Sequence, residues 1–256
     1  MTYRVQVEGV PSDETLRRLL EEARAKGATE VIVETSHEAG DAWIRAGFRE
    51  ASRVLAAPVE TLERLLSTAR RPSFGSIHVQ NDDVEAVVHA VRQYVPRLPG
   101  SSRGSVVLPP RDGWTSVYDE LCDREPEMLR RLGVELSNRS GALVLAIGVE
   151  EGRVVRYIAL DRGRVVDEYL SVPEYYGPLP PGEVIALGAN ARLMARLTGA
   201  DPAQVRDVAV TAPSSAGHPP AAELVVALGR LFGVRGAEHG YEAARSAPGA
   251  IELPRV

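Results

Sequence analysis

"ALVLAIGVE", residues 142–150, is the stretch on which the fold depends. It is apolar almost throughout, and an apolar run of this length indicates a β-strand that is covered on both faces. A helix is expected just before it, over residues 125–141. Two further strands are expected after it, at residues 154–161 and 164–173, joined at the two-residue turn Arg162-Gly163, which is a hairpin signal. Together these segments predict an α/β (α+β) domain.

Segments on either side complete this domain. Three more strands are expected, over residues 76–80, 105–110 and 114–120. A helix over residues 83–95, capped by Asn81 or Asp82, lies between the first two. Beyond a proline-rich stretch, helices are expected near residues 185–199, 201–212 and 220–233. The domain is therefore predicted to hold a mixed sheet with a β-hairpin, followed by C-terminal helices. The tail, residues 236–256, shows little apolar pattern and is expected to be loose.

The N-terminal part of the chain reads as a separate α/β unit, also with a mixed sheet. A strand alternates apolar and polar residues from Tyr3, and the helix that follows has Ser12 as its N-cap and Gly27 at its end. A strand, a short helix, a strand and a closing helix are then expected, over residues 29–35, 38–47, 48–58 and 59–69. A linker at residues 67–76 marks the boundary. The expected divisions are residues 1–70, residues 71–235 and the tail, residues 236–256.

The run "LRRLLEEARAKGATEVIVETSHEAGDAWIRAGFREASRVLAAP", residues 16–58, resembles the C-terminal half of a GCN5-related N-acetyltransferase. In that family a helix and a strand are followed by a short helix, a Gly-Phe pair and a final strand. Gly47 and Phe48 are the matching pair here. The resemblance is confined to the first unit, residues 2–68. The second unit, with "GWTSVYDE" at 113–120 and "DEYLSVPEY" at 167–175, resembles a group of uncharacterised bacterial proteins, which implies no activity.

The acetyltransferase resemblance fails where the cofactor would bind. The family holds the pyrophosphate of acetyl-CoA in a turn of the form Arg/Gln-x-x-Gly-x-Gly/Ala. The corresponding turn here, residues 9–14, has one glycine, then Pro11, which lacks an N–H donor, and the acids Asp13 and Glu14. The front half of the family fold has no counterpart either. We therefore expect no cofactor and a shortened relative that does not bind acetyl-CoA. An unrelated α/β unit of similar layout is one alternative. The other is a working N-acetyltransferase that uses acetyl-CoA on an amine substrate.

Charge and composition argue against several classes of function. The net charge of -5 gives no electrostatic case for nucleic acid or for an anionic membrane. Cys122 is the only cysteine, so no intrachain disulfide forms, and the acids around it disfavour its thiolate. The five histidines are scattered, and no pair has the spacing of a metal site. No apolar run is long enough to span a membrane, and the first residues lack the pattern of a signal peptide, so none is expected. A cytoplasmic location is expected.

Aromatic and acidic residues concentrate in two segments of a chain that is only 5% aromatic. Strand alternation places Trp114, Tyr118 and Glu120 on one face of the strand at 114–120. It also places Asp167 and Tyr169 on one face of the second hairpin strand, with Tyr175 just beyond. If the two faces adjoin, these six residues form an aromatic and acidic surface suited to a protein partner or a small polar ligand. In the alternative interpretation, the aromatics fill the edge of the core and the acids are solvated.

The sequence thus favours a non-catalytic binding or regulatory module, built partly on an acetyltransferase-like unit. The rival hypothesis is the N-acetyltransferase. A third interpretation is a homodimer in which a second copy supplies the missing half of that enzyme.

Overall fold

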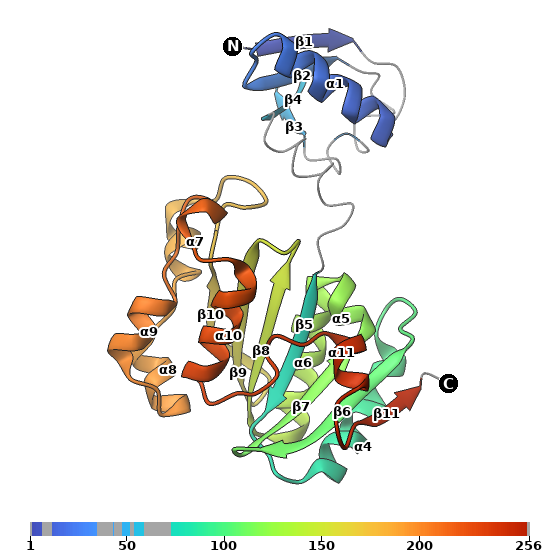
Figure 1. The fold of residues 1–256 in the computed structure, drawn as a ribbon, viewed down its shortest axis with the longest axis vertical. Helices are drawn as coiled ribbons and strands as arrows, with labels where there is room; N and C mark the ends of the chain where they lie inside the picture. The colour runs from blue at the N-terminus through green and yellow to red at the C-terminus, as the bar shows by residue number, and fades with distance from the viewer. Residues whose placement is uncertain are drawn as a thin grey trace. The chain divides into compact units, whose positions relative to one another are not determined.

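The chain folds into two compact units, Met1–Arg71 and Pro72–Val256, each described here by itself. The computed structural model describes residues 2–6, 12–34, 43, 48–51, 54–58 and 73–254. Helices and sheets occur in both units, which confirms the α/β (α+β) class (Figure 1). Over the described ranges, no helix combines the length and the apolar character needed to cross a bilayer.

The first unit has a four-stranded sheet in the order β1-β2-β4-β3. Its elements are β1 (Thr2–Gln6), α1 (Asp13–Ala25), β2 (Glu30–Glu34), β3 (Arg49–Ala51) and β4 (Val54–Pro58). β1 pairs with β2 in parallel and the other pairs are antiparallel, so this sheet is mixed, as expected. Ser12 caps α1 by accepting from the backbone N–H of Thr15 at 3.2 Å. The expected short helix at 38–47, apart from Trp43, the closing helix at 59–69 and most of the linker lie outside the described residues.

The second unit has a seven-stranded sheet in the order β10-β9-β8-β5-β7-β6-β11. Its strands are β5 (Phe74–Val79), β6 (Gly104–Arg111), β7 (Trp114–Asp119), β8 (Leu143–Glu150), β9 (Val154–Asp161), β10 (Arg164–Leu170) and β11 (Ile251–Pro254). Every pairing in it is antiparallel, so the mixed sheet expected for this unit is a wrong prediction. Tight turns fix the pairs β6–β7, β8–β9 and β9–β10. β5 then lies between β7 and β8, antiparallel to both, and separates the two strands that run in the same direction.

Helices cover both faces of this sheet. They are α4 (Val84–Tyr94), α5 (Glu120–Arg124), α6 (Pro126–Ser140), α7 (Pro181–Ala186), α8 (Ala191–Thr198), α9 (Pro202–Val208), α10 (Ala221–Leu231) and α11 (Tyr241–Arg245), with short 3-10 turns at Val95–Arg97 and Ser215–Gly217. In Figure 1, α10 passes in front of β8 and β9, and α4 and α6 lie behind the sheet. Val144 of β8 packs with the α4 and α6 side, while Leu145 packs with the side of α8, α9 and α10. β8 is buried at every position, which confirms the strand covered on both faces.

The C-terminal tail is ordered, which corrects the expectation of a loose segment after Gly236. β11 pairs with β6 and forms one edge of the sheet. In α11, Tyr241 and Ala244 pack against Val106 and Tyr118. The two elements of the tail are too short to show a hydrophobic period in the sequence, so only their contacts with distant strands reveal them.

The start of α4 differs in detail from the prediction. Asp83, rather than Asn81 or Asp82, is the N-cap, and its carboxylate accepts from the backbone N–H of Ala86 at 3.0 Å. Asn81 instead accepts from the N–H of Asp83 at 2.9 Å and shapes the turn before the helix. Three neighbouring residues of this chain can cap a helix, and only the backbone geometry selects one of them.

The hairpin turn at Arg162-Gly163 is confirmed. Asp161 pairs with Arg164, and the two turn residues have φ values of 49° and 75°. Two residues at positive φ match the twist of antiparallel strands, which is why glycine occupies the second position. Asp112 and Gly113 form the same kind of turn between β6 and β7, with φ values of 54° and 83°.

We predict that Gly163→Ala destabilises the protein more than Gly113→Ala. Both substitutions force alanine into positive φ, which costs about 1 kcal/mol. At Gly163 the added Cβ also lies 2.8 Å from Asn138 Cβ, whereas nothing lies within 4 Å at Gly113. Urea denaturation measures both. Gly182→Ala, at a position with no close neighbour and no positive φ, is the control. Equal losses for Gly163→Ala and Gly113→Ala would contradict the close packing of this turn on α6.

Candidate functional site

The six residues expected to form an aromatic and acidic surface do not form one. Trp114 and Tyr118 lie on β7, and Tyr169 lies on β10, with β5, β8 and β9 between them. Their exposed fractions are 4% for Trp114 and 0% for the two tyrosines. Asp167 is buried as well. The aromatics fill the space between the sheet and the helices, so the core interpretation holds for them.

The polar groups of the β10 residues have partners inside the protein. Tyr169 Oη donates to the carbonyl oxygen of Val210 at 2.6 Å, and its ring stacks on that of Tyr157. Asp167 accepts from Tyr157 Oη at 2.7 Å and from the backbone N–H of Asn190 at 3.1 Å. These contacts tie the edge of the sheet to the segments before α8 and after α9.

Tyr175 lies in the turn after β10. Its hydroxyl donates to Glu151 at 2.6 Å, and its ring packs partly buried beside Leu170 and Val172. It therefore joins two loops and does not adjoin Tyr118.

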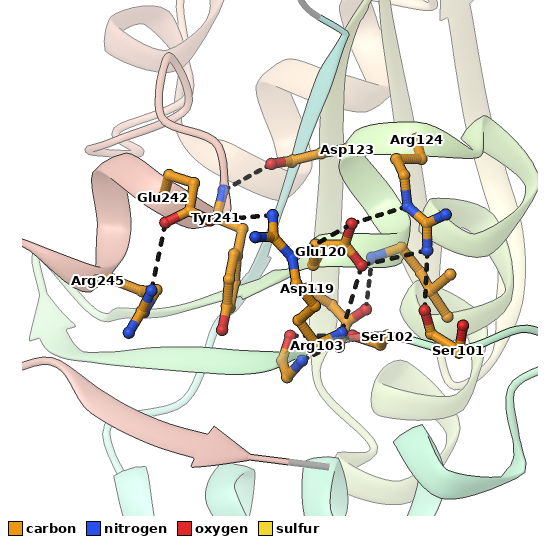
Figure 2. Close-up of polar contacts among 12 residues, drawn as sticks. Ser101, Ser102, Arg103, Asp119, Glu120, Asp123, Arg124, Tyr241, Glu242 and Arg245 are labelled. Atoms are coloured by element: carbon orange, nitrogen blue, oxygen red, sulfur yellow. Dashed lines mark hydrogen bonds and ion pairs between the residues drawn. The ribbon is translucent and has the colours of Figure 1, made fainter.

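Glu120 starts α5 instead of continuing β7, so it does not share a face with Trp114 and Tyr118. Its carboxylate pairs with Arg124 at 2.8 Å (Figure 2). Asp123 accepts from the backbone N–H of Tyr241 at 2.8 Å. Burial raises the pKa of Asp123 to about 6, and two backbone hydrogen bonds oppose that shift. These acids hold α5 and the start of α11 in place.

The other groups near α5 are also structural. Asp119 accepts from Ser105 Oγ at 2.6 Å and from the backbone N–H of Leu121 at 2.9 Å, and it caps α5. Burial raises the pKa of the Cys122 thiol well above its usual value, and Asp119 adds to the effect. The thiol therefore stays protonated and is a poor nucleophile. Over the described ranges, no group of three histidine, cysteine or acidic residues is placed to hold a metal ion.

A cleft of about 690 Å³ opens over the β6–β7 hairpin, between α10 and the segment that contains α11. Its size falls in the range of small-molecule sites. Residues lining it include Leu108, Arg111, Trp114 and Ser116 from the sheet, Val226 and Arg230 from α10, Arg235 from the turn after α10, and His239, Ala243 and Ala247 from the tail. Trp114 is the one residue of the predicted surface that contributes to this lining. Within the described part of the chain, His239 Nδ1 is the only buried side-chain nitrogen or oxygen without a hydrogen-bond partner, and His239 borders this cleft.

The charge of the cleft is opposite in sign to that of the whole chain. Arg111, Arg230 and Arg235 line it, against the acids Asp112 and Glu238. Asp112 neutralises Arg235, since its carboxylate lies 2.6 Å from Arg235 Nε. Across the described ranges, Arg111 and Arg230 make no ion pair with an acidic side chain. The chain carries a net charge of -5, so these two free guanidinium groups mark a local cationic site.

A buried polar network lies behind the cleft floor. His78 on β5 has no exposed surface, and its Nδ1 lies 2.8 Å from Ser116 Oγ. Its Nε2 lies 2.9 Å from Ser76 Oγ. Tyr118 Oη donates to the carbonyl oxygen of Gly236 at 3.0 Å. Burial lowers the pKa of His78 to about 3, with a smaller contribution from the charge of His239, so the imidazole is neutral at physiological pH.

This network positions groups and does not activate a nucleophile. In a serine hydrolase the histidine that faces the serine is held by a carboxylate, which stabilises the imidazolium ion. Here the second nitrogen of His78 faces Ser76, a neutral hydroxyl. With its pKa near 3, His78 is too weak a base to deprotonate Ser116 at neutral pH. The arrangement fixes the direction of the Ser116 hydroxyl at the cleft floor.

The sequence did not predict this site, although one local signal for it is present. Ser76 and His78 alternate with apolar residues in a buried strand, which is a signal for a polar group aimed at one face. That signal does not say what lies opposite. The tail supplies His239 and one wall of the cleft, and it was expected to be loose.

No family model, curated protein or solved structure matches this chain. The site therefore rests on its own geometry.

We predict that His78 makes stability fall on acidification. The folded-state pKa of about 3 lies below the usual 6.5, so between these values the unfolded chain binds a proton that the folded protein cannot accept. Stability from this group is fully present above pH 6.5 and is lost as pH falls. The loss between pH 7 and pH 5 is about 2 kcal/mol. His78→Leu removes this term, so its free energy of unfolding approaches that of the wild type as pH falls.

Urea denaturation at a series of pH values measures the difference. His89→Leu, on the exposed face of α4, controls for the loss of an imidazole as such. If the free energies of unfolding of the wild type and of His78→Leu differ by a constant amount from pH 7 to pH 5, His78 protonates in the folded protein as it does in the unfolded chain, and the prediction is wrong.

Proposed function

We propose that the unit Pro72–Val256 is a non-catalytic binding module, and that its ligand is a small organic anion held in the cleft between α10 and α11. The observation that carries this proposal is the pair Arg111 and Arg230. Both line the cleft, and in the described residues neither is neutralised by an acid. Arginine presents a planar fork of N–H donors that suits a phosphate or a carboxylate.

The rest of the cleft supports an organic ligand over a bare inorganic ion. Leu108, Val226, Ala243 and Ala247 give it apolar walls, and its volume exceeds what an inorganic anion needs. Small-molecule sites commonly combine apolar walls with a few polar groups that fix orientation. We therefore expect an apolar body against the walls and an anionic group at Arg111 and Arg230.

For the first unit, we propose a shortened acetyltransferase-like scaffold that does not bind acetyl-CoA. Its support is the N-terminus of α1, where the cofactor pyrophosphate would lie in the family. Ser12 already occupies the N–H of Thr15, and Asp13 and Glu14 form an exposed acidic first turn. Negative side chains at this position repel a pyrophosphate. Residues 9–11, the remainder of the corresponding turn, lie outside the described residues.

We predict that Arg111→Gln and Arg230→Gln each weaken binding of cyclohexylmethyl phosphate, a probe with one phosphate and an apolar ring. Each loses a charge-assisted contact at a solvent-exposed position, so a weakening of about fivefold is expected. Isothermal titration calorimetry measures the affinity. Arg206→Gln, on the exposed face of α9, is the matched control, because it removes the same charge away from the cleft. Affinity that is unaffected by either cleft substitution would remove the support for an anion site here.

Titration with acetyl-CoA tests the proposal for the first unit. We expect no saturable heat, because the acids at the start of α1 oppose the pyrophosphate. Asp13→Asn and Glu14→Gln in one variant removes that repulsion and serves as a comparison. Saturable binding to the wild type would instead favour the N-acetyltransferase hypothesis.

A further inference from the structure

Ser116 lies at the floor of the cleft and is neutral, whereas Arg111 and Arg230 make the mouth of the cleft cationic. Ser116 is 6% exposed and lines the cleft. Trp114 and Leu108 flank it with apolar surface. Among the polar residues that line the cleft, Ser116 is the one whose direction the buried network fixes.

Two neighbours behind Ser116 offer acceptors for its hydrogen: Nδ1 of His78 and the phenol oxygen of Tyr118. The role of His78 follows from its contact with Ser76. Ser76 Oγ lies 3.4 Å from the carbonyl oxygens of Ile147 and Ala237, which can only accept. We assign the Ser76 hydrogen to these oxygens, and in this assignment Ser76 Oγ accepts from His78 Nε2 at 2.9 Å. A neutral imidazole that donates from Nε2 has a bare Nδ1. Nδ1 then accepts the hydrogen of Ser116 at 2.8 Å.

Tyr118 leads to the same orientation. Its hydroxyl hydrogen is engaged by the carbonyl oxygen of Gly236, which leaves the phenol oxygen as an acceptor. Burial raises the pKa of Tyr118, and a hydrogen bond from Ser116 partly offsets the rise. Whichever acceptor it uses, the hydrogen of Ser116 points into the protein. The lone pairs of Ser116 Oγ remain for the cleft.

We propose that Ser116 is a hydrogen-bond acceptor at the cleft floor, so that the ligand is an alcohol-bearing organic anion whose hydroxyl donates to Ser116 Oγ. His78 and Ser76 are positioning residues, because they act on the ligand through Ser116. A carbonyl group in the place of that hydroxyl faces the lone pairs of Ser116 and is disfavoured. This inference rests on the proposed anion site and adds the second group that the ligand must carry.

Matched derivatives of cyclohexylmethyl phosphate test the inference. The probes are the parent compound, its 2-, 3- and 4-hydroxy derivatives and the corresponding ketones, titrated by calorimetry. One net hydrogen bond contributes about 0.5–1.5 kcal/mol, so we expect the best alcohol to bind about threefold to tenfold more tightly than its ketone. In Ser116→Ala the alcohol-to-ketone ratio falls to about one, because the acceptor oxygen is gone.

The control is Ser246→Ala, which removes another hydroxyl from the cleft lining, at an exposed position outside the His78 network. It leaves the ratio unchanged. His78→Leu removes the nitrogen acceptor of the Ser116 hydrogen and leaves only Tyr118, so the alcohol-to-ketone ratio falls but stays above that of Ser116→Ala, which is a readout that a purely structural role does not move.

The two proposals fail in different ways. Binding of the parent compound with an alcohol-to-ketone ratio of one in the wild type leaves the anion site standing and overturns the role of Ser116. A ratio above one that persists in Ser116→Ala overturns it as well. No binding of any probe overturns the anion site, and this inference with it. If Ser116→Ala does not fold, the wild-type ratio and the His78→Leu ratio decide.

Discussion

Burial of the central sheet on both faces is the constraint on which the rest of the second unit depends. Helices cover β8 from two sides, and every polar group between the layers loses water. An unpaired buried group costs about 1–3 kcal/mol, so such groups must find partners inside the protein. Tyr157, Tyr169 and His78 all meet this requirement. The hydrogen-bond network at the cleft floor is thus a consequence of burying the sheet on both faces. The same network fixes the direction of the Ser116 hydroxyl.

How well the sequence predicts each part of this structure depends on how far apart along the chain the interacting residues are. Residues 142–150 identify a covered strand because burial on both faces leaves a continuous apolar run. The Arg162-Gly163 turn was predictable because its chemistry is local. The antiparallel sheet was not, because the position of β5 between β7 and β8 is a long-range choice that no local pattern records.

The candidate site depends even more on distant contacts. Tyr118 meets Gly236, and Asp123 meets Tyr241, each across 118 positions of the chain. The sequence singled out Trp114 by its residue type, but its place in the cleft lining appears only when the tail folds back over β6 and β7. Tyr118 and Tyr169 are core residues, which alternation alone cannot distinguish from surface ones.

The electrostatics of the cleft would link the stability of the second unit to binding of the proposed anion. Arg111, Arg230 and Arg235 lie around one opening, and only Arg235 has an acidic partner in the described residues. Like charges around a concave, low-dielectric wall repel one another more than they do on an open surface. A bound anion relieves that repulsion in the folded state, whereas the unfolded chain spreads the same charges apart. An anion that binds only the folded protein therefore stabilises it by mass action, by about 2.7 kcal/mol at a hundredfold excess over its Kd. The tail segment forms one wall of the cleft, so binding of the proposed anion would also stabilise the attachment of the tail to the sheet.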